Sequence, residues 1–333
     1  DFCLSRGLGD VYKRQLLGLG LLLELLFWAC YPLFANATPI NDAAKQALLD
    51  LFPWLPQLYW TSIFPQLAQA MVHVATFDFA NHSGSINLLF LLQYLAFALM
   101  LIAGWVGRRV TKERLARTDI RALFLTVLAF TLIFGITFLF VPGILTQDIF
   151  AYAAYGRLVT LYHVNPYVTS LAAFPHDLLY ASLAKSTLGA VPPGPVWLDL
   201  CLPVVLVARE SVANVFIDFR LLGFAAYLAN AVLIWYVLAR LRPETRIFAT
   251  ILYAWNPLVL LLSISGMHLE VVLVLCILLA LLFFQRNSPM LGWVFILLAM
   301  LISIWSLLLL PLFFLLFAKA SRPLRDGRRA LWW

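Results

Sequence analysis

The feature that most constrains this chain is a series of apolar runs, each close to 20 residues long and almost free of charge. A helix of about 20 residues crosses the hydrocarbon core of a bilayer, whereas β-barrel strands alternate polar and apolar positions over about ten residues. Hydrophobic residues make up 63% of the chain and charged residues 12%, far from the composition of soluble domains. The sequence therefore predicts an all-α integral membrane protein built as a polytopic helical bundle.

Hydropathy divides the chain into about eight spans. Residues 1–15 resemble translated adapter sequence and are expected to be a non-native tail, and residues 321–333 are expected to be a truncated cytoplasmic loop. The membrane domain is expected between them, over residues 16–320. The last two spans are short and are expected to form one broken hairpin. The spans are expected near residues 16–35, 86–106, 122–142, 214–239, 247–264, 271–285, 290–303 and 304–319.

Basic residues gather in short loops between the apolar runs, which indicates topology and not a nucleic-acid interface. They fill loops 107–121 and 240–246, recur at Arg286, and return in 319–329. By the positive-inside rule these four segments are cytoplasmic. The apolar stretch 195–208 then cannot be a span, because a crossing there would move 240–246 outside. We expect it to be a re-entrant or membrane-parallel helix.

With this topology the long segments 36–85 and 143–213 and the turn 266–270 face the exterior. Segment 143–213 is long for a loop, and loops of that size are uncommon unless they are functional. We expect it to be a functional loop.

Asp148 is a lone carboxylate just beyond the apolar run 122–142. Ionisable groups at that depth are functional candidates by default. If a helix follows, Asp148, Tyr152 and Tyr155 fall at i, i+4 and i+7 and share one face. An acid with two phenols would suit a hydroxyl-rich substrate. The alternative is an ordinary interfacial aspartate among the tyrosines of an aromatic belt.

Two further motifs lie in the same loop. Asn165-Pro166 favours a turn, and Tyr167 suits either an aromatic shelf for a sugar ring or an anchor at the membrane interface. Pro193-Gly194-Pro195 fixes a rigid bend before stretch 195–208. The bend either holds two halves of a cleft or simply starts the helix.

Three polar positions outside that loop are also candidates. Arg220 lies beside Asp218 near the outer half of its span and could clamp a phosphate or pair with that aspartate. His268 and Glu270 share an outer turn, on the same membrane face as Asp148; a lone histidine there is more often structural, and the shared location supports the alternative of a common site. The His-x-Glu spacing is weak as a metal signal, so a divalent metal is left open.

Six short motifs follow one another in a fixed order. They are Thr146-Gln147-Asp148-Ile149-Phe150-Ala151-Tyr152, Asn165-Pro166-Tyr167, Pro193-Gly194-Pro195-Val196-Trp197, Phe219-Arg220-Leu221-Leu222, Trp255-Asn256-Pro257-Leu258 and Gly266-Met267-His268-Leu269-Glu270. The series resembles the GT-C glycosyltransferases, and most closely the actinobacterial polyprenyl-phosphate-mannose-dependent α-mannosyltransferases.

The resemblance implies an inverting hexosyltransferase with a GT-C-like membrane domain. It would move a mannose-like sugar from a polyprenyl-phosphate donor to a hydroxyl of a glycan or glycolipid acceptor, at the extracytoplasmic side of the inner membrane. No cofactor is expected, because the lipid-linked donor is a substrate. Asp148 would match the acid of the first catalytic loop, as general base or acceptor binder. Substrate binding is expected of Gln147, Tyr152, Tyr155, Asn165, Tyr167, Arg220, His268 and Glu270.

The chain also departs from the family pattern. Pro193-Gly194-Pro195 stands where Tyr-Gly-Pro is frequent, and His268-Leu269-Glu270 stands where His-Asn-Asp is expected. A lysine expected near the last spans is missing from Ile304-Trp305-Ser306. Two other functions stay open, an inactive scaffold and a transporter or flippase of lipid-linked sugars. A transporter would hold charges near the bilayer midplane and show repeated halves, whereas the acids here gather at one face.

Overall fold

The computed structural model describes residues 2–37, 83–112, 117–141, 148–177, 193–209 and 211–311, and all regular elements in these ranges are helices. The α-helices are α1 (Phe2–Ala37), α5 (Ser83–Lys112), α6 (Arg117–Leu139), α7 (Asp148–Thr160), α8 (Pro195–Ala208), α9 (Val212–Leu241), α10 (Arg246–Ala254), α11 (Pro257–Leu260), α12 (Glu270–Gln285) and α13 (Pro289–Ile302). Short 3₁₀ segments are η2 (Leu171–Ala173), η4 (Pro243–Thr245) and η6 (Ile304–Leu309), and η5 (Leu261–Ser265) is a π-helical turn. The all-α prediction is confirmed for this part of the chain.

Fewer than eight helices among the described residues are long and apolar enough to cross a membrane. Within the described residues, α5, α6 and α9 are long and apolar enough to cross a bilayer, and α10 with α11 and η5 is a fourth if that pair, bent by 52°, counts as one span. Helices α12 and α13 coincide with predicted spans but are short, and residues 312–319 of the last predicted span lie outside the described ranges. About eight spans are therefore not confirmed.

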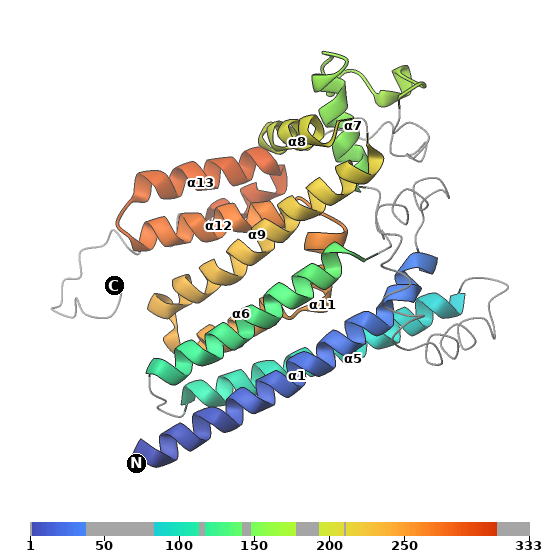
Figure 1. Ribbon diagram of the computed structural model, residues 1–333. Helices are drawn as coiled ribbons and strands as arrows, with labels where there is room; N and C mark the ends of the chain where they lie inside the picture. Colours follow the sequence, from blue (N-terminus) through green and yellow to red (C-terminus); the bar gives the residue numbers. More distant parts are fainter. Residues whose placement is uncertain are drawn as a thin grey trace.

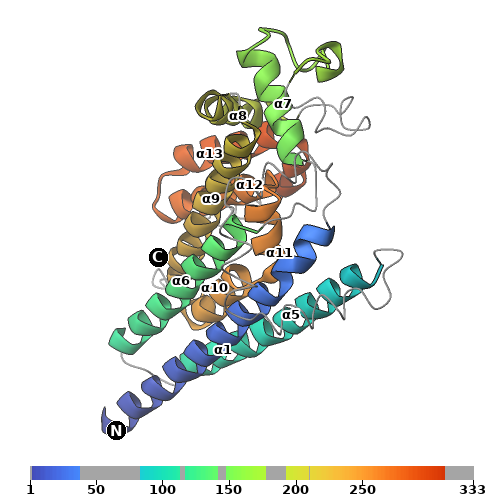
Figure 2. The same ribbon diagram turned by 45° about the vertical axis from the view of Figure 1, so that its right-hand side comes forward.

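The stretch 195–208 forms the short helix α8, as predicted. Its 14 residues would extend only about 21 Å at 1.5 Å per residue, well short of the roughly 30 Å hydrocarbon core. Figures 1 and 2 show α7 and α8 lying across one end of the bundle, away from the N-terminus. Helix α1 runs through the residues predicted to be a non-native tail, and that prediction remains untested.

The bent pair owes its shape to Asn256-Pro257. Proline lacks the backbone N–H that a continuous helix requires, so α10 ends at Ala254 and a new helix must start at Pro257. The Asn256 side chain caps that start by accepting hydrogen bonds from the N–H groups of Leu258 (2.9 Å) and Val259 (3.3 Å). The π-turn η5 follows and leads the chain to His268.

Aromatic packing anchors this break against the rest of the bundle. The Trp255 ring contacts Phe130 and Phe134 of α6 edge to face, both at 5.6 Å between centroids, and its indole N–H donates to the carbonyl of Val127 at 3.2 Å. Phe134 in turn packs on Phe27 of α1 at 5.1 Å. In a membrane such packing holds helices together, since lipid offers no hydrophobic driving force between them.

Candidate active site

The structure brings Asp148, His268 and Glu270 together at the end of the bundle that carries α7 and α8 (Figure 1). Oδ2 of Asp148 lies 3.0 Å from Nδ1 of His268, and Oε2 of Glu270 lies 3.8 Å from the same nitrogen. The side chains are 41%, 23% and 68% exposed in the order Asp148, His268, Glu270. The cluster is therefore open to solvent on its acidic side and covered around the imidazole.

Backbone geometry sets each of these three side chains. Asp148 is the first residue of α7, where the helix dipole favours a negative charge. Met267 adopts a left-handed φ of 47°, and the N–H of His268 donates to the carbonyl of Leu262 at 2.9 Å, which turns the imidazole back toward α7. A Cβ at Gly266 would lie 3.0 Å from Cδ2 of His268, so the small residue leaves room for the ring. Glu270 then starts α12.

The close pairing of Asp148 and His268 orients both groups. The imidazole contacts the carboxylate through Oδ2, and the second carboxylate oxygen, Oδ1, has no partner among the described residues. The other imidazole nitrogen, Nε2, is buried and likewise has no hydrogen-bond partner in the described part of the chain. The arrangement can thus present one carboxylate oxygen of Asp148 to a substrate hydroxyl.

Tyr152 and Tyr155 follow Asp148 on α7, as the predicted spacing requires, and both are buried. The Tyr152 ring packs edge to face on Trp197 of α8 at 5.0 Å, and its hydroxyl accepts a hydrogen bond from the N–H of Leu269. Burial, followed by the charges of Asp148 and Glu270, raises the pKa of Tyr152 far above its ordinary value. Burial and Asp148 also raise the pKa of Tyr155. Both phenols are therefore neutral at physiological pH.

Asn165 and Tyr167 lie in the loop after α7 and contact each other. Oδ1 of Asn165 accepts from the N–H of Tyr167 at 2.9 Å, and the Tyr167 hydroxyl donates to the carbonyl of Pro193 at 2.8 Å. The two residues thus join this loop to the bend before α8. Their substrate-binding role remains a prediction, and the predicted residue Gln147 lies outside the described residues.

The bend at Pro193-Gly194 packs against the end of α13. The N–H of Gly194 donates to the carbonyl of Ile302 at 3.1 Å, and a Cβ on Gly194 would lie 2.0 Å from the carbonyl oxygen of Leu301. Only glycine allows this approach. Since Gly194 is also the N-cap of α8, the motif starts that helix and fastens its start to α13.

Arg220 contacts backbone carbonyls and not Asp218. It is 3% exposed, and its guanidinium donates to the carbonyls of Leu139 (3.0 Å), Val141 (2.7 Å) and Ser265 (3.3 Å). These bonds satisfy carbonyls at the ends of α6 and η5, where a cation is also favoured by the helix dipole. Asp218 lies two residues away on the same helix, and side chains at i and i+2 do not face each other. Arg220 therefore links α6 to the segment before His268, and its role in binding a phosphate remains a prediction.

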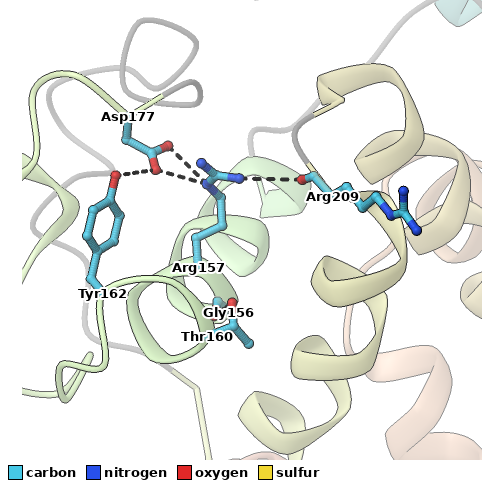
Figure 3. A network of polar contacts seen from close by, with 6 residues as sticks. All are labelled: Gly156, Arg157, Thr160, Tyr162, Asp177 and Arg209. Atoms are coloured by element: carbon cyan, nitrogen blue, oxygen red, sulfur yellow. Dashed lines mark hydrogen bonds and ion pairs between the residues drawn. The ribbon is translucent and has the colours of Figure 1, made fainter.

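A buried charge network in the outer loop was not predicted from the sequence (Figure 3). Nε of Arg157 lies 2.9 Å and 3.2 Å from the two carboxylate oxygens of Asp177, and Nη1 donates to the carbonyl of Arg209 at 3.5 Å. The Tyr162 hydroxyl donates to Asp177 at 2.9 Å. Breaking one side of such a pair costs about 3–5 kcal/mol. Its one sequence signal is an arginine in a loop expected outside, against the positive-inside rule.

Glu24 is a second polar group that sequence reasoning missed. It lies in the first predicted span, where its Oε1 accepts from the indole N–H of Trp28 at 2.6 Å and from the hydroxyl of Thr137. The carboxylate thereby joins α1 to α6. A single acid within an apolar run was the available signal.

A metal site receives no support from the described residues, in which no three acidic, imidazole or thiol groups converge as ligands.

Comparison with known families shows to which family the chain belongs. The family model described as alpha-(1->6)-mannopyranosyltransferase, N-terminal domain, matches residues 59–319, well over half of the chain. The chain belongs to this mannosyltransferase family. The predicted resemblance to α-mannosyltransferases is thereby confirmed, and the matched segment includes Asp148 and His268. No match was found among curated proteins or among solved structures.

Membership of this family indicates that the protein is a glycosyltransferase, which acts on a sugar donor and an acceptor. Its apolar helices agree with a membrane protein. All of α1 lies outside the matched residues, although this helix packs closely on α5 and α6.

Proposed function

We propose that the protein is an inverting mannosyltransferase of the GT-C type that uses a polyprenyl-phosphate sugar as donor. The acceptor is a hydroxyl of a glycan or glycolipid, reached at the extracytoplasmic face of the inner membrane. The observation that carries this proposal is the contact between Asp148 and His268 at 3.0 Å. It places an oriented carboxylate at the end of the bundle where α7 and α8 lie (Figure 2).

The reaction asks little covalent chemistry of the protein. The acceptor oxygen attacks the anomeric carbon, the bond from that carbon to the phosphate oxygen breaks, and its electron pair leaves with the polyprenyl phosphate. The acceptor proton passes to Asp148 as general base. Attack from the face opposite the phosphate inverts the anomeric centre, in keeping with one carboxylate acting as base.

The geometry of Asp148 supports this role. His268 holds Oδ2, so Oδ1 is the oxygen that can take the proton. Arg220 is buried and its guanidinium already donates to backbone carbonyls, so we assign the departing phosphate to other groups. The candidates for stabilising the donor phosphate are the N-terminal turns of α7 and α12, since helix N-termini attract anions. The first residues of these helices are Asp148 and Glu270, so we expect the phosphate to lie beside the two carboxylates and not in contact with them.

Replacing Asp148 with asparagine tests the proposal, with Asp199→Asn as a matched control on the exposed surface of α8. Turnover of a polyprenyl-phosphate mannose donor should fall by about 10²–10⁴-fold in Asp148→Asn, with unchanged size-exclusion and circular-dichroism profiles. Glu270→Gln should cost less, because Glu270 lies 3.8 Å from the imidazole. Full turnover in Asp148→Asn would remove this residue from the mechanism. Movement of the intact donor across vesicles without sugar transfer would favour a flippase.

A further inference from the structure

Arg157 joins three segments of the outer end that are separate in the sequence. It lies near the C-terminal end of α7, and it contacts Asp177 of the following loop and the carbonyl of Arg209 at the end of α8. Figure 3 shows its guanidinium between these two partners, while the Arg209 side chain points away. The Arg157 and Asp177 side chains are 8% and 0% exposed. A charged pair this deeply buried is stable only in a narrow range of geometries.

The same stretch of α7 is fitted to α8 by a glycine. A Cβ on Gly156 would lie 2.6 Å from Cγ2 of Val205 and 3.3 Å from the carbonyl oxygen of Cys201, so the two helices touch at this point. One turn earlier the Tyr152 ring rests on Trp197. Helix α7 is thus fastened to α8 along one side, and the Arg157 network fixes the far end of that contact.

Asp148 lies at the opposite end of α7 from Arg157. The separation of nine residue steps from Asp148 to Arg157 corresponds to about 13.5 Å along the helix axis, so a tilt of about 5° at Arg157 would move Asp148 by about 1 Å. A misplacement of about 1 Å can cost about 10²-fold in rate. The contact between Asp148 and His268 is 3.0 Å long, so a displacement of that size would break it.

We propose that Arg157 is a positioning residue, which sets the orientation of α7 through Asp177 and the Arg209 carbonyl and thereby the place of Asp148 relative to His268. The inference rests on the proposed role of Asp148. Arg157 does not touch the reacting groups in this assignment. Its loss acts on kcat through geometry and leaves donor binding nearly unchanged.

The decisive variant removes both charges at once, Arg157→Met with Asp177→Leu. Replacing a buried ion pair by apolar residues commonly preserves stability, so the double variant should unfold near the wild-type temperature. Arg157→Met alone should unfold at a lower temperature, because it leaves the buried Asp177 carboxylate without this partner. The kcat of the double variant should nevertheless stay at least about 10-fold low, with KM for the donor within about threefold of wild type. Arg209→Gln is the matched control, because only its carbonyl enters the network, and it should keep full activity. Recovery of kcat together with stability in the double variant would overturn the proposal.

A second readout does not depend on activity. Spin labels at Leu161→Cys, just after α7, and Met290→Cys, at the start of α13, report the orientation of α7. Pulsed electron paramagnetic resonance measures the distance between the two labels. A Cys3→Ser background suits this measurement, since the other cysteines are buried. The distance distribution should broaden or shift in the double variant, and an unchanged distribution would contradict the positioning role. If Asp148→Asn kept full turnover, the proposed function would fail, while this distance measurement would still decide what Arg157 does.

Discussion

Replacing Gly223 of α9 by alanine tests how the His268 turn is supported. A Cβ at this position would lie 2.2 Å from the carbonyl oxygen of Ser263 and 2.5 Å from Sδ of Met267. The methionine side chain can swing aside, but the Ser263 oxygen belongs to the backbone of η5. That oxygen must recede by about 0.8 Å to reach the 3.0 Å limit of real contacts. The displaced backbone at Ser263 lies five residues before His268 in the chain.

The expected size of the effect follows from two opposing terms. Overpacking of this kind costs about 1–3 kcal/mol, and alanine in place of glycine within a helix returns about 0.5–1 kcal/mol. The net loss of unfolding free energy should therefore lie between about 0 and about 2.5 kcal/mol. Turnover should suffer more, because a displacement of nearly 1 Å at His268 would lengthen its 3.0 Å contact with Asp148 beyond hydrogen-bonding distance. A loss approaching about 10²-fold is expected.

Thermal unfolding in detergent and turnover of the lipid-linked donor measure the two effects separately. Gly18→Ala is the control, since a Cβ there meets nothing within 4 Å, and it should be neutral or stabilise by about 0.5–1 kcal/mol. If Gly223→Ala left both unfolding and turnover at wild-type values, the contact between α9 and η5 would not govern the His268 turn.

Two other predictions concern Tyr152 and the sidedness of the bundle. Tyr152→Phe keeps the ring but leaves the N–H of Leu269 without its acceptor, which should cost about 1–3 kcal/mol. Because burial raises the pKa of the Tyr152 phenol in the folded protein, the wild-type protein should lose stability above a pH of about 10, where the unfolded tyrosine ionises. The difference in unfolding free energy between wild type and Tyr152→Phe should therefore narrow in thermal unfolding measured from pH 7 to 11. A constant difference would contradict the burial of this phenol. In intact cells, an impermeant maleimide should label Val168→Cys, in the exposed loop after α7, and not Glu244→Cys, in the basic segment 240–246. The reverse pattern would invert the proposed topology.

The sequence alone determined the features that depend on local composition and on neighbours along the chain. Apolar runs gave the helical class, Asn256-Pro257 marked the break between α10 and α11, and a stretch too short to span became α8. The spacing of Asp148, Tyr152 and Tyr155 placed them on one face of a helix that the structure contains. Motif order also led to the mannosyltransferase family.

The partners of the polar side chains were decided only by tertiary structure. Adjacency in sequence suggested Asp218 as the partner of Arg220, yet helical geometry separates the two and burial directs Arg220 to carbonyls of α6 and η5. Arg157 finds Asp177 and the Arg209 carbonyl only because α7 packs on α8 through Gly156. The pair of Asp148 and His268 likewise requires the left-handed turn at Met267 and the support of α9 beneath it. A buried polar group must be satisfied by whatever the fold brings within reach, and that set is a property of the packed helices and not of the sequence near the group.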